Sequence, residues 1–323
     1  MSGKRELLCV GDGLVDFLSC TPKKQLQTSE LFRRCPGGSA VNTAIVASRL
    51  GLATTLLSAF GADLFGDILS SVLQEEQVDT SSILRVKGMG TALAFASSPR
   101  GKPEFCCLRS SQKPESKLTK EHIPKLPHFV HLCSLLSCML ASTEFIDELL
   151  QRVTIEQSLL TYDPNIANAN VEASLVRSRI MKCINRAHIV KMSADDLALL
   201  FPSKTFDEAL AELSQMNVPM LIITLGKEGL FVRVGDIHFS LGAISVPVKD
   251  TVGAGDAFTA GLVYALSQAK LLKIEDILQA KEKELRRICL FAAAVGAAAC
   301  TTVGAFGGVQ NLAQIKELLK ECR

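Results

Sequence analysis

Net charge of either sign is almost absent from this sequence. Its 323 residues include 35 basic and 33 acidic side chains, which leaves a formal charge of +2. Proteins that bind nucleic acid over a broad surface carry a basic field, and none is predicted here. No stretch of roughly 18 uninterrupted apolar residues occurs, and residues 290–300 form the nearest candidate, which is too short to span a membrane. We therefore expect neither nucleic-acid binding nor a membrane span.

Ordered cysteine motifs are also missing. The eleven cysteines are scattered, no CxxC pair occurs, and no cysteine–histidine cluster has the spacing of a zinc site. An odd number of cysteines argues against a closed set of disulfides. The first six residues lack the apolar run of a signal peptide. Together these absences predict a reducing, cytoplasmic location.

Short runs of β-forming residues alternate with amphipathic helical patterns along most of the chain. Hydrophobic residues make up 48% of it, which is enough for a large core. We predict strands at 7–10, 55–59, 129–135, 159–163, 188–192 and 219–224, and helices at 41–50, 63–77, 142–153, 194–201 and 312–321. Gly51 stands where the first helix would be capped. This alternation predicts a mostly parallel central sheet with helices on both faces.

Two regions, 14–35 and 90–109, interrupt this alternation. Both are rich in β-forming and polar residues, and 104–108 could return as the hairpin partner of 91–97. We predict that they form a small β-strand lid within a single domain of residues 1–323. Such a lid would exclude water from a reaction, whereas an ordinary edge hairpin is the alternative. Its strand edges could also carry the contact of a homodimer.

The most informative segment is Asp250-Thr251-Val252-Gly253-Ala254-Gly255-Asp256-Ala257-Phe258. Glycines allow backbone N–H groups to approach phosphate oxygens, and the helical pattern that follows adds the donors of a helix start. Asp256 then stands beside an anion site, where a carboxylate can accept a proton from an attacking hydroxyl. The chain has no GxxxxGK loop and no early GxGxxG loop, so neither of these familiar nucleotide-binding devices is expected.

Two further glycine-rich segments precede predicted helices. In Pro36-Gly37-Gly38-Ser39-Ala40-Val41-Asn42, the Asn42 side chain would lie in the first helical turn, within reach of a ligand. A tight turn with Ser39 as N-terminal cap is the alternative interpretation. Gly61-Ala62-Asp63-Leu64-Phe65-Gly66-Asp67 directly follows a predicted strand, and Asp63 is by itself typical of a helix N-cap.

These segments, taken in order, resemble the ribokinase-like carbohydrate kinases, or PfkB family. The family's Gly-Gly-x-x-x-Asn motif is matched by Gly37, Gly38 and Asn42, and its early aspartate by Asp16. The strongest match is the signature from Asp250 to Phe258. The resemblance spans nearly the whole chain and implies a three-layer α/β/α fold that transfers phosphate from ATP to a sugar.

Fructokinases are the members that the chain resembles most, through residues 91–95 with Arg109 and through Asp163-Pro164-Asn165. Fructose 6-phosphate is the product that this implies, while 2-keto-3-deoxygluconate, ribose or a nucleoside remains an alternative acceptor. The resemblance implies Asp256 as general base and Gly253, Ala254 and Gly255 as donors to the phosphoryl group. It implies a sugar site of Asp16, Gly37, Gly38, Asn42, Arg109 and Asp256.

The nucleotide side is implied by strand-end and turn residues. They are Lys191, Ser193, Thr224, Gly226 and Gly229, together with Gly253 and Gly255. The small-residue helix at 290–299 would flank the adenine. Magnesium would arrive with ATP, and a potassium-like ion could bind at Asp250 and Thr251.

Four positions depart from the family's pattern. Ser193 and Asp196 replace an asparagine and a glutamate, Ala167 stands in place of an arginine, and an asparagine near Ala293 is missing. These departures bear on phosphate, metal and adenine handling. They also motivate a different class of function, a catalytically weak relative that acts as a binding or scaffold protein.

Overall fold

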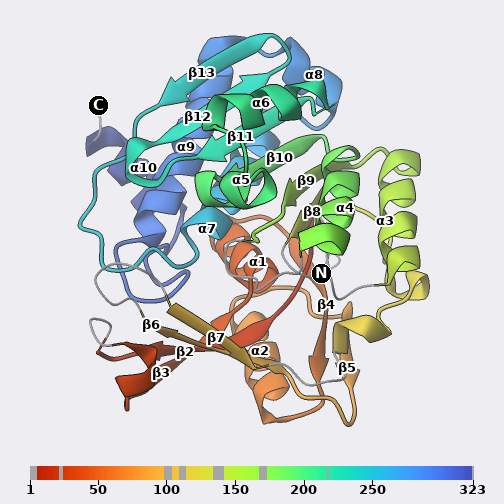
Figure 1. Cartoon of the computed structure of the whole chain (residues 1–323), viewed down its shortest axis with the longest axis vertical. Coiled ribbons are helices and arrows are strands. Elements are labelled where there is room, and N and C mark those ends of the chain that lie inside the picture. The colour runs from red at the N-terminus through yellow and green to blue at the C-terminus, as the bar shows by residue number, and fades with distance from the viewer. Residues whose placement is uncertain are drawn as a thin grey trace.

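A large sheet and a small sheet organise the chain in the computed structural model (Figure 1). The structure describes residues 6–21, 25–97, 104–108, 114–133, 142–166, 173–216 and 218–321. The large sheet has nine strands in the order β13-β12-β11-β10-β9-β8-β1-β4-β5. Their bounds are β1 Leu7–Val10, β4 Thr54–Gly61, β5 Ile83–Val86, β8 Phe129–Cys133, β9 Leu159–Asp163, β10 Ile189–Ser193, β11 Met220–Thr224, β12 Leu230–Val234 and β13 Ile237–Leu241.

In the large sheet, the seven neighbouring strands β11, β10, β9, β8, β1, β4 and β5 pair in parallel. Strands β12 and β13 add an antiparallel edge next to β11. Alternate residues of β1 enter two separate hydrophobic clusters: Leu7 and Cys9 face one, and Leu8 and Val10 face the other. Both faces of the sheet are therefore buried, as a parallel sheet requires.

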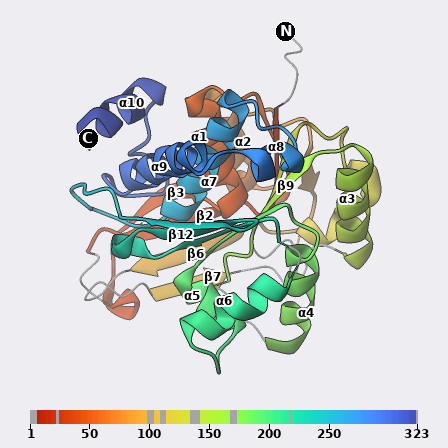
Figure 2. The same ribbon diagram turned by 90° about the horizontal axis from the view of Figure 1, so that it is seen from above.

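Helices cover the two faces (Figure 2). The first cluster packs under α1 Ser39–Leu50, α2 Leu64–Glu75, α7 Ala254–Gln268, α8 Ile274–Gln279, α9 Glu282–Ala299 and α10 Leu312–Glu321. The second packs under α3 Thr143–Ile155, α4 Ala173–Ile184, α5 Ala194–Leu200 and α6 Phe206–Gln215. This three-layer arrangement confirms the predicted fold class. Within the described ranges, none of the helices combines the length and apolarity needed to cross a bilayer.

The small sheet is the predicted lid. It has the order β3-β2-β6-β7, with β2 Leu14–Ser19, β3 Phe32–Gly37, β6 Ala92–Ser97 and β7 Glu104–Leu108. The hairpin of β6 and β7 is antiparallel as expected, while β2 and β6 pair in parallel. Phe17 stacks on Phe95 at 4.9 Å between ring centroids and meets Phe65 of α2 edge-on. Aromatic packing thus joins the lid strands to one another and to the helical layer.

Local sequence signals account for the end of α1 and the start of α2. Gly51 adopts a left-handed φ of 102° and caps α1, and the Asp63 side chain accepts the Gly66 N–H at the start of α2. Strands β5, β12 and β13 were not predicted. The predicted strand at 129–135 ends at Cys133, and its last two residues lie outside the described ranges.

Candidate active site

The start of α7 sets the position of Asp256. Gly253 precedes the helix with φ 75°, a left-handed conformation, and a Cβ atom there would lie 2.4 Å from the Ala305 carbonyl oxygen. Only glycine fits this position without strain and collision. The tight entry places Gly255 and Asp256 in the first helical turn, where the N–H groups of a helix start and the positive end of its dipole favour an anion.

Asp256 is held by two side chains from α1. Ser39 Oγ donates to its Oδ1 at 2.7 Å, and Asn42 Nδ2 donates to its Oδ2 at 2.8 Å. The residue is only 7% exposed. Burial raises the pKa of Asp256 to about 6, although both hydrogen bonds and the nearby Lys191 favour the ionised form. A carboxylate with this pKa is ionised at neutral pH and basic enough to accept a proton.

A buried ion pair lies beside the glycine loop. Lys191 Nζ, near the end of β10, donates to Asp163 Oδ2 at the end of β9 at 2.7 Å. Burial alone would lower the pKa of Lys191, but the Asp163 carboxylate raises it above its ordinary value. A Cβ atom at position 255 would lie 2.5 Å from Nζ, so the ammonium group and the Gly255 backbone are immediate neighbours. The two together can receive an anionic group.

Asp16 of β2 lies against the other glycine-rich segment. A Cβ atom at Gly37 would collide with its Oδ2, and a Cβ atom at Gly38, which has φ 97°, would lie 2.6 Å from the Asp12 carbonyl oxygen. Burial and the neighbouring carboxylates of Asp12, Asp256 and Asp250 raise the pKa of Asp16 to about 7. Asp16, Gly37, Gly38 and Asn42 are therefore gathered beside Asp256, as expected from the sequence.

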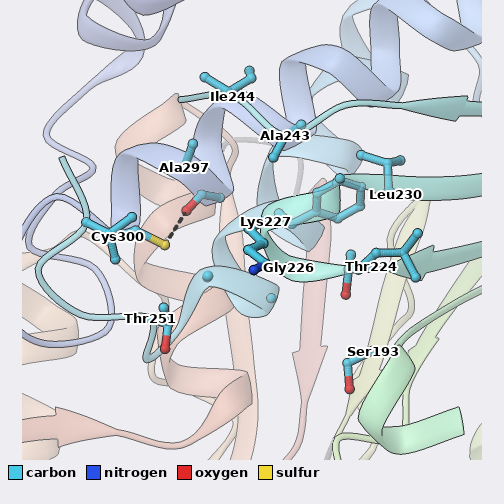
Figure 3. A pocket seen from close by; sticks show the side chains of 18 of the residues that line it. Ser193, Thr224, Gly226, Lys227, Leu230, Ala243, Ile244, Thr251, Ala297 and Cys300 are labelled. Atoms are coloured by element: carbon cyan, nitrogen blue, oxygen red, sulfur yellow. Dashed lines mark hydrogen bonds between the residues drawn. The ribbon is translucent and has the colours of Figure 1, made fainter. Parts of the chain in front are cut away.

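A pocket of about 860 Å³ opens next to this centre (Figure 3). Ala243 and Ile244 lie at one end of it, and Ser193 and Thr251 at the other. Gly255 belongs to both the pocket and the first turn of α7, so the pocket extends to the residue before Asp256. Among the residues expected on the nucleotide side, those that line it are Ser193, Thr224, Gly226, Gly229 and Gly255.

The pocket wall formed by α9 carries no long polar side chain. Ala293, Gly296 and Ala297 line it, and Cys300 at the C-cap directs its thiol to the Gly296 carbonyl at 3.4 Å. A flat purine ring can lie against such a surface of small residues. Recognition of the ring edge would then depend on other parts of the wall.

Several expectations need correction or fall outside the described residues. Ser39 is not the N-cap of α1, because Gly38 occupies that position and the Ser39 hydroxyl turns to Asp256. Ser193 is the N-cap of α5: its hydroxyl accepts the Asp196 N–H at 3.0 Å, and the Asp196 carboxylate accepts the Ser193 N–H in return, so the two form a capping box. Arg109 and Ala167 lie outside the described residues.

Asp250 has both carboxylate oxygens engaged with backbone. Oδ1 accepts the Val252 N–H at 3.2 Å, and Oδ2 accepts the Gly304 N–H at 3.0 Å. The carboxylate thereby ties the glycine loop to the loop after α9. Across the part of the chain that the structure describes, no three His, Cys, Asp or Glu side chains gather as a metal site.

Sequence reasoning missed the roles of Ser39, Asp163 and Asn165. Asn165 donates from Nδ2 to the Ser39 hydroxyl that in turn contacts Asp256. The ion pair had a signal that could have found it, since Asp163 and Lys191 are lone opposite charges in two apolar strands that are consecutive along the chain. Buried charges are usually paired, so neighbouring strands would place them together.

Comparison with known proteins agrees with this architecture. The pfkB family carbohydrate kinase pattern matches residues 4–311. Probable fructokinase-7 of Arabidopsis thaliana is 31% identical over 98% of this chain and 93% of its own length. Fructokinase-1 of Zea mays is 28% identical over 99% of both chains.

A solved structure is also similar to this chain in fold. The fructokinase of Xylella fastidiosa, crystallised with bound ATP, superimposes with a TM-score of 0.85 over 99% of both chains at 26% identity. The match covers the large sheet, the lid and the site between them. With its family pattern and its fold in agreement, this chain belongs to the pfkB family of carbohydrate kinases.

Proposed function

We propose that this chain transfers the γ-phosphate of ATP to the primary hydroxyl of fructose and forms fructose 6-phosphate. The observation that carries the proposal is the position of Asp256, a buried carboxylate in the first turn of α7, next to the glycine that borders the 860 Å³ pocket. Relatives named fructokinase that align with nearly the entire chain support fructose as the acceptor.

Asp256 accepts the hydroxyl proton while the sugar oxygen attacks the terminal phosphorus. The bond from that phosphorus to the bridging oxygen of ADP breaks, and ADP leaves with the electron pair. The proton stays on the carboxylate until product release returns it to solvent. A pKa of about 6 suits this cycle because the group is ionised before the transfer and can lose the proton afterwards.

The glycine loop and Lys191 stabilise charge during the transfer. The N–H groups at the start of α7 face the phosphoryl oxygens, and Lys191 adds a fixed positive charge at Gly255. Asp16 and Asn42 hold sugar hydroxyls and so orient the reacting one. The lid strand β2, which carries Asp16, limits access of water to this space.

Metal ions would play a supporting part. Mg²⁺ bound to ATP offsets the phosphate charge, and it needs few protein ligands, which fits a site without a cluster of three acidic side chains among the described residues. A monovalent cation such as K⁺ is proposed at the loop of Asp250 and Thr251.

We also propose a cytoplasmic location and a homodimer that pairs through the lid edges β3 or β7.

Purified protein with ATP and MgCl₂, offered fructose, ribose, 2-keto-3-deoxygluconate and nucleosides in turn, tests the acceptor through ADP release. We expect fructose to give the highest kcat/KM, and Asp256→Asn to lose about a hundredfold to ten-thousandfold in kcat because a general base is removed. Mass spectrometry identifies the product. Lack of turnover with every acceptor would overturn the proposed activity.

A further inference from the structure

The Ser39 hydroxyl sits between a group that can only donate and a group that accepts. Asn165 Nδ2 donates to Ser39 Oγ, and Ser39 Oγ donates to Asp256 Oδ1 at 2.7 Å. A hydroxyl has a single hydrogen, and an ionised carboxylate accepts hydrogen bonds only. Because the Asn165 NH2 group can only donate and the ionised carboxylate can only accept, the Ser39 hydrogen is directed to Asp256. The order of donors along this chain is therefore fixed.

Asn165 is in turn fixed by the buried ion pair. Its backbone N–H donates to Asp163 Oδ1 at 3.2 Å, while Asp163 Oδ2 accepts from Lys191 at 2.7 Å. Asn165 has φ 43°, a left-handed conformation that asparagine tolerates better than most residues. The backbone turn after β9 thus aims the amide at Ser39. A continuous run of hydrogen bonds connects the ammonium group at Gly255 with the base.

We propose that Ser39 and Asn165 are positioning residues that hold the Asp256 carboxylate ionised and oriented for proton transfer. The inference rests on the proposed kinase activity and deepens it, because it assigns to two further residues the readiness of the base. Ser39 contacts the carboxylate directly, and Asn165 acts through Ser39. Neither residue needs to touch the sugar or ATP in this role.

The surroundings of Asp256 make such support necessary. The titratable and charged groups that interact with it from the elements packed around it are Asp163, Lys191, Asp16, Cys9 and Cys133. Only Lys191 among these is positively charged, and it is paired with Asp163. Neutral donors such as Ser39 and Asn42 therefore stabilise the negative charge without adding another titrating group.

Loss of the Ser39 donor shifts the protonation of the base in a defined direction. Without it the ionised form is less stable, so the pKa of Asp256 rises and the acid limb of the kcat profile moves to higher pH. A hydrogen bond to a charged group predicts a shift of about one pH unit for Ser39→Ala. Below the limb this is roughly a tenfold loss of kcat, and above it the loss largely disappears.

Asn165→Asp tests the order of donors. A carboxylate at position 165 competes for the Ser39 hydrogen and adds negative charge near Asp256, so we expect a shift at least as large as that of Ser39→Ala. Ser48→Ala is the matched control. It lies on the same helix and loses a hydroxyl that donates to the Glu76 carbonyl at 2.7 Å, far from the base. Its profile should coincide with the wild type, although both serine variants lose stability.

The experiment measures kcat against pH for the three variants and the wild type, together with the Asp256 carboxyl titration by ¹³C NMR. The Asp256 signal is assigned by its loss in Asp256→Asn. An upward shift in Ser39→Ala and Asn165→Asp, but not in Ser48→Ala, supports the proposal. An unshifted Asp256 titration in both variants overturns it.

The NMR titration needs no turnover, so it separates the two proposals. If the wild type phosphorylates no acceptor but the carboxyl titration shifts, the proposed function fails while the support of Asp256 by Ser39 stands. If the wild type phosphorylates fructose and the titrations of both variants match it, the support fails alone. A loss of kcat that is equal at every pH would also overturn the proposal, because a purely structural role predicts it.

Discussion

Replacement of Asp16 by asparagine should stabilise the unliganded protein above neutral pH while it weakens catalysis. Asp16 is 9% exposed, and Asp12, Asp256 and Asp250 interact with it as negative charges. Burial and these neighbours raise its pKa from 3.8 to about 7. Asparagine has nearly the same shape and no charge, so the variant removes the electrostatic cost and keeps the packing.

The magnitude follows from the shift in pKa. Between 3.8 and about 7 the folded protein keeps a proton on Asp16 that the unfolded chain releases, so the free energy of unfolding falls as pH rises through this range. One pKa unit corresponds to about 1.36 kcal/mol, which gives an upper limit of roughly 4 kcal/mol above pH 7. Because local relaxation reduces this cost, we expect a gain of about 2–4 kcal/mol in the variant near pH 8 and about a third of that gain near pH 5, which lies about 1.2 units above 3.8.

Urea unfolding of wild type and Asp16→Asn at about pH 5 and about pH 8 measures this difference directly. Asp236→Asn is the control, since Asp236 is exposed in the turn between β12 and β13. In parallel, kcat/KM for the sugar should fall by about tenfold to a hundredfold, because hydrogen bonds from sugar hydroxyls to a charged acceptor are lost. The reasoning is refuted if the variant is no more stable at pH 8 than the wild type, or if its gain is the same at both pH values.

Three further changes test other parts of the site. Below about pH 6, log kcat should fall with a slope of one against pH as Asp256 takes up a proton. A pH–rate profile at saturating ATP measures this slope. A kcat that stays constant down to pH 4 would contradict the prediction. Lys191→Met should lower the free energy of unfolding by about 3–5 kcal/mol, because it leaves the buried Asp163 carboxylate without the Lys191 ammonium group. The variant should also raise KM for ATP. Urea unfolding that matches the wild type would contradict this prediction. Asp63→Ala removes the cap of α2 and the acceptor of the Thr91 N–H at 2.7 Å. We expect the free energy of unfolding to fall by about 1–3 kcal/mol and hydrogen exchange in the lid hairpin to become faster. Unaltered exchange in the hairpin would count against this role of Asp63.

The fold was largely predictable because its signals are local. The short apolar run of β1, the glycine after α1 and the Asp63 cap each act within a few residues, and sequence reasoning found all three. The missed strands β12 and β13 form an edge hairpin whose alternation is short and whose turn, Gly235-Asp236, was not recognised as a hairpin connection.

The chemistry of the site was only partly predictable because its contacts are distant in sequence. The glycine loop and Asp256 are contiguous and could be interpreted together. The partner of Ser39 is 217 residues away, and a local rule gave its hydroxyl to the start of α1 instead. The missed role of Asn165 has the same origin, since its target lies 126 residues earlier in the chain. Local propensity predicts helix caps well. It cannot predict which polar side chain will instead form a hydrogen bond with a residue distant in sequence.

The packing of α1 against α7 has a consequence for synthesis. Ser39 and Asn42 belong to the first part of the chain to be made, and Asp256 to a much later part. A ribosome-bound intermediate that has released only the early strands can bury apolar surface, but it lacks Asp256, which we propose as the proton acceptor. Phosphorylation capacity should therefore arise in one step, late in translation, and fragments of the chain that stop before α7 should consume no ATP.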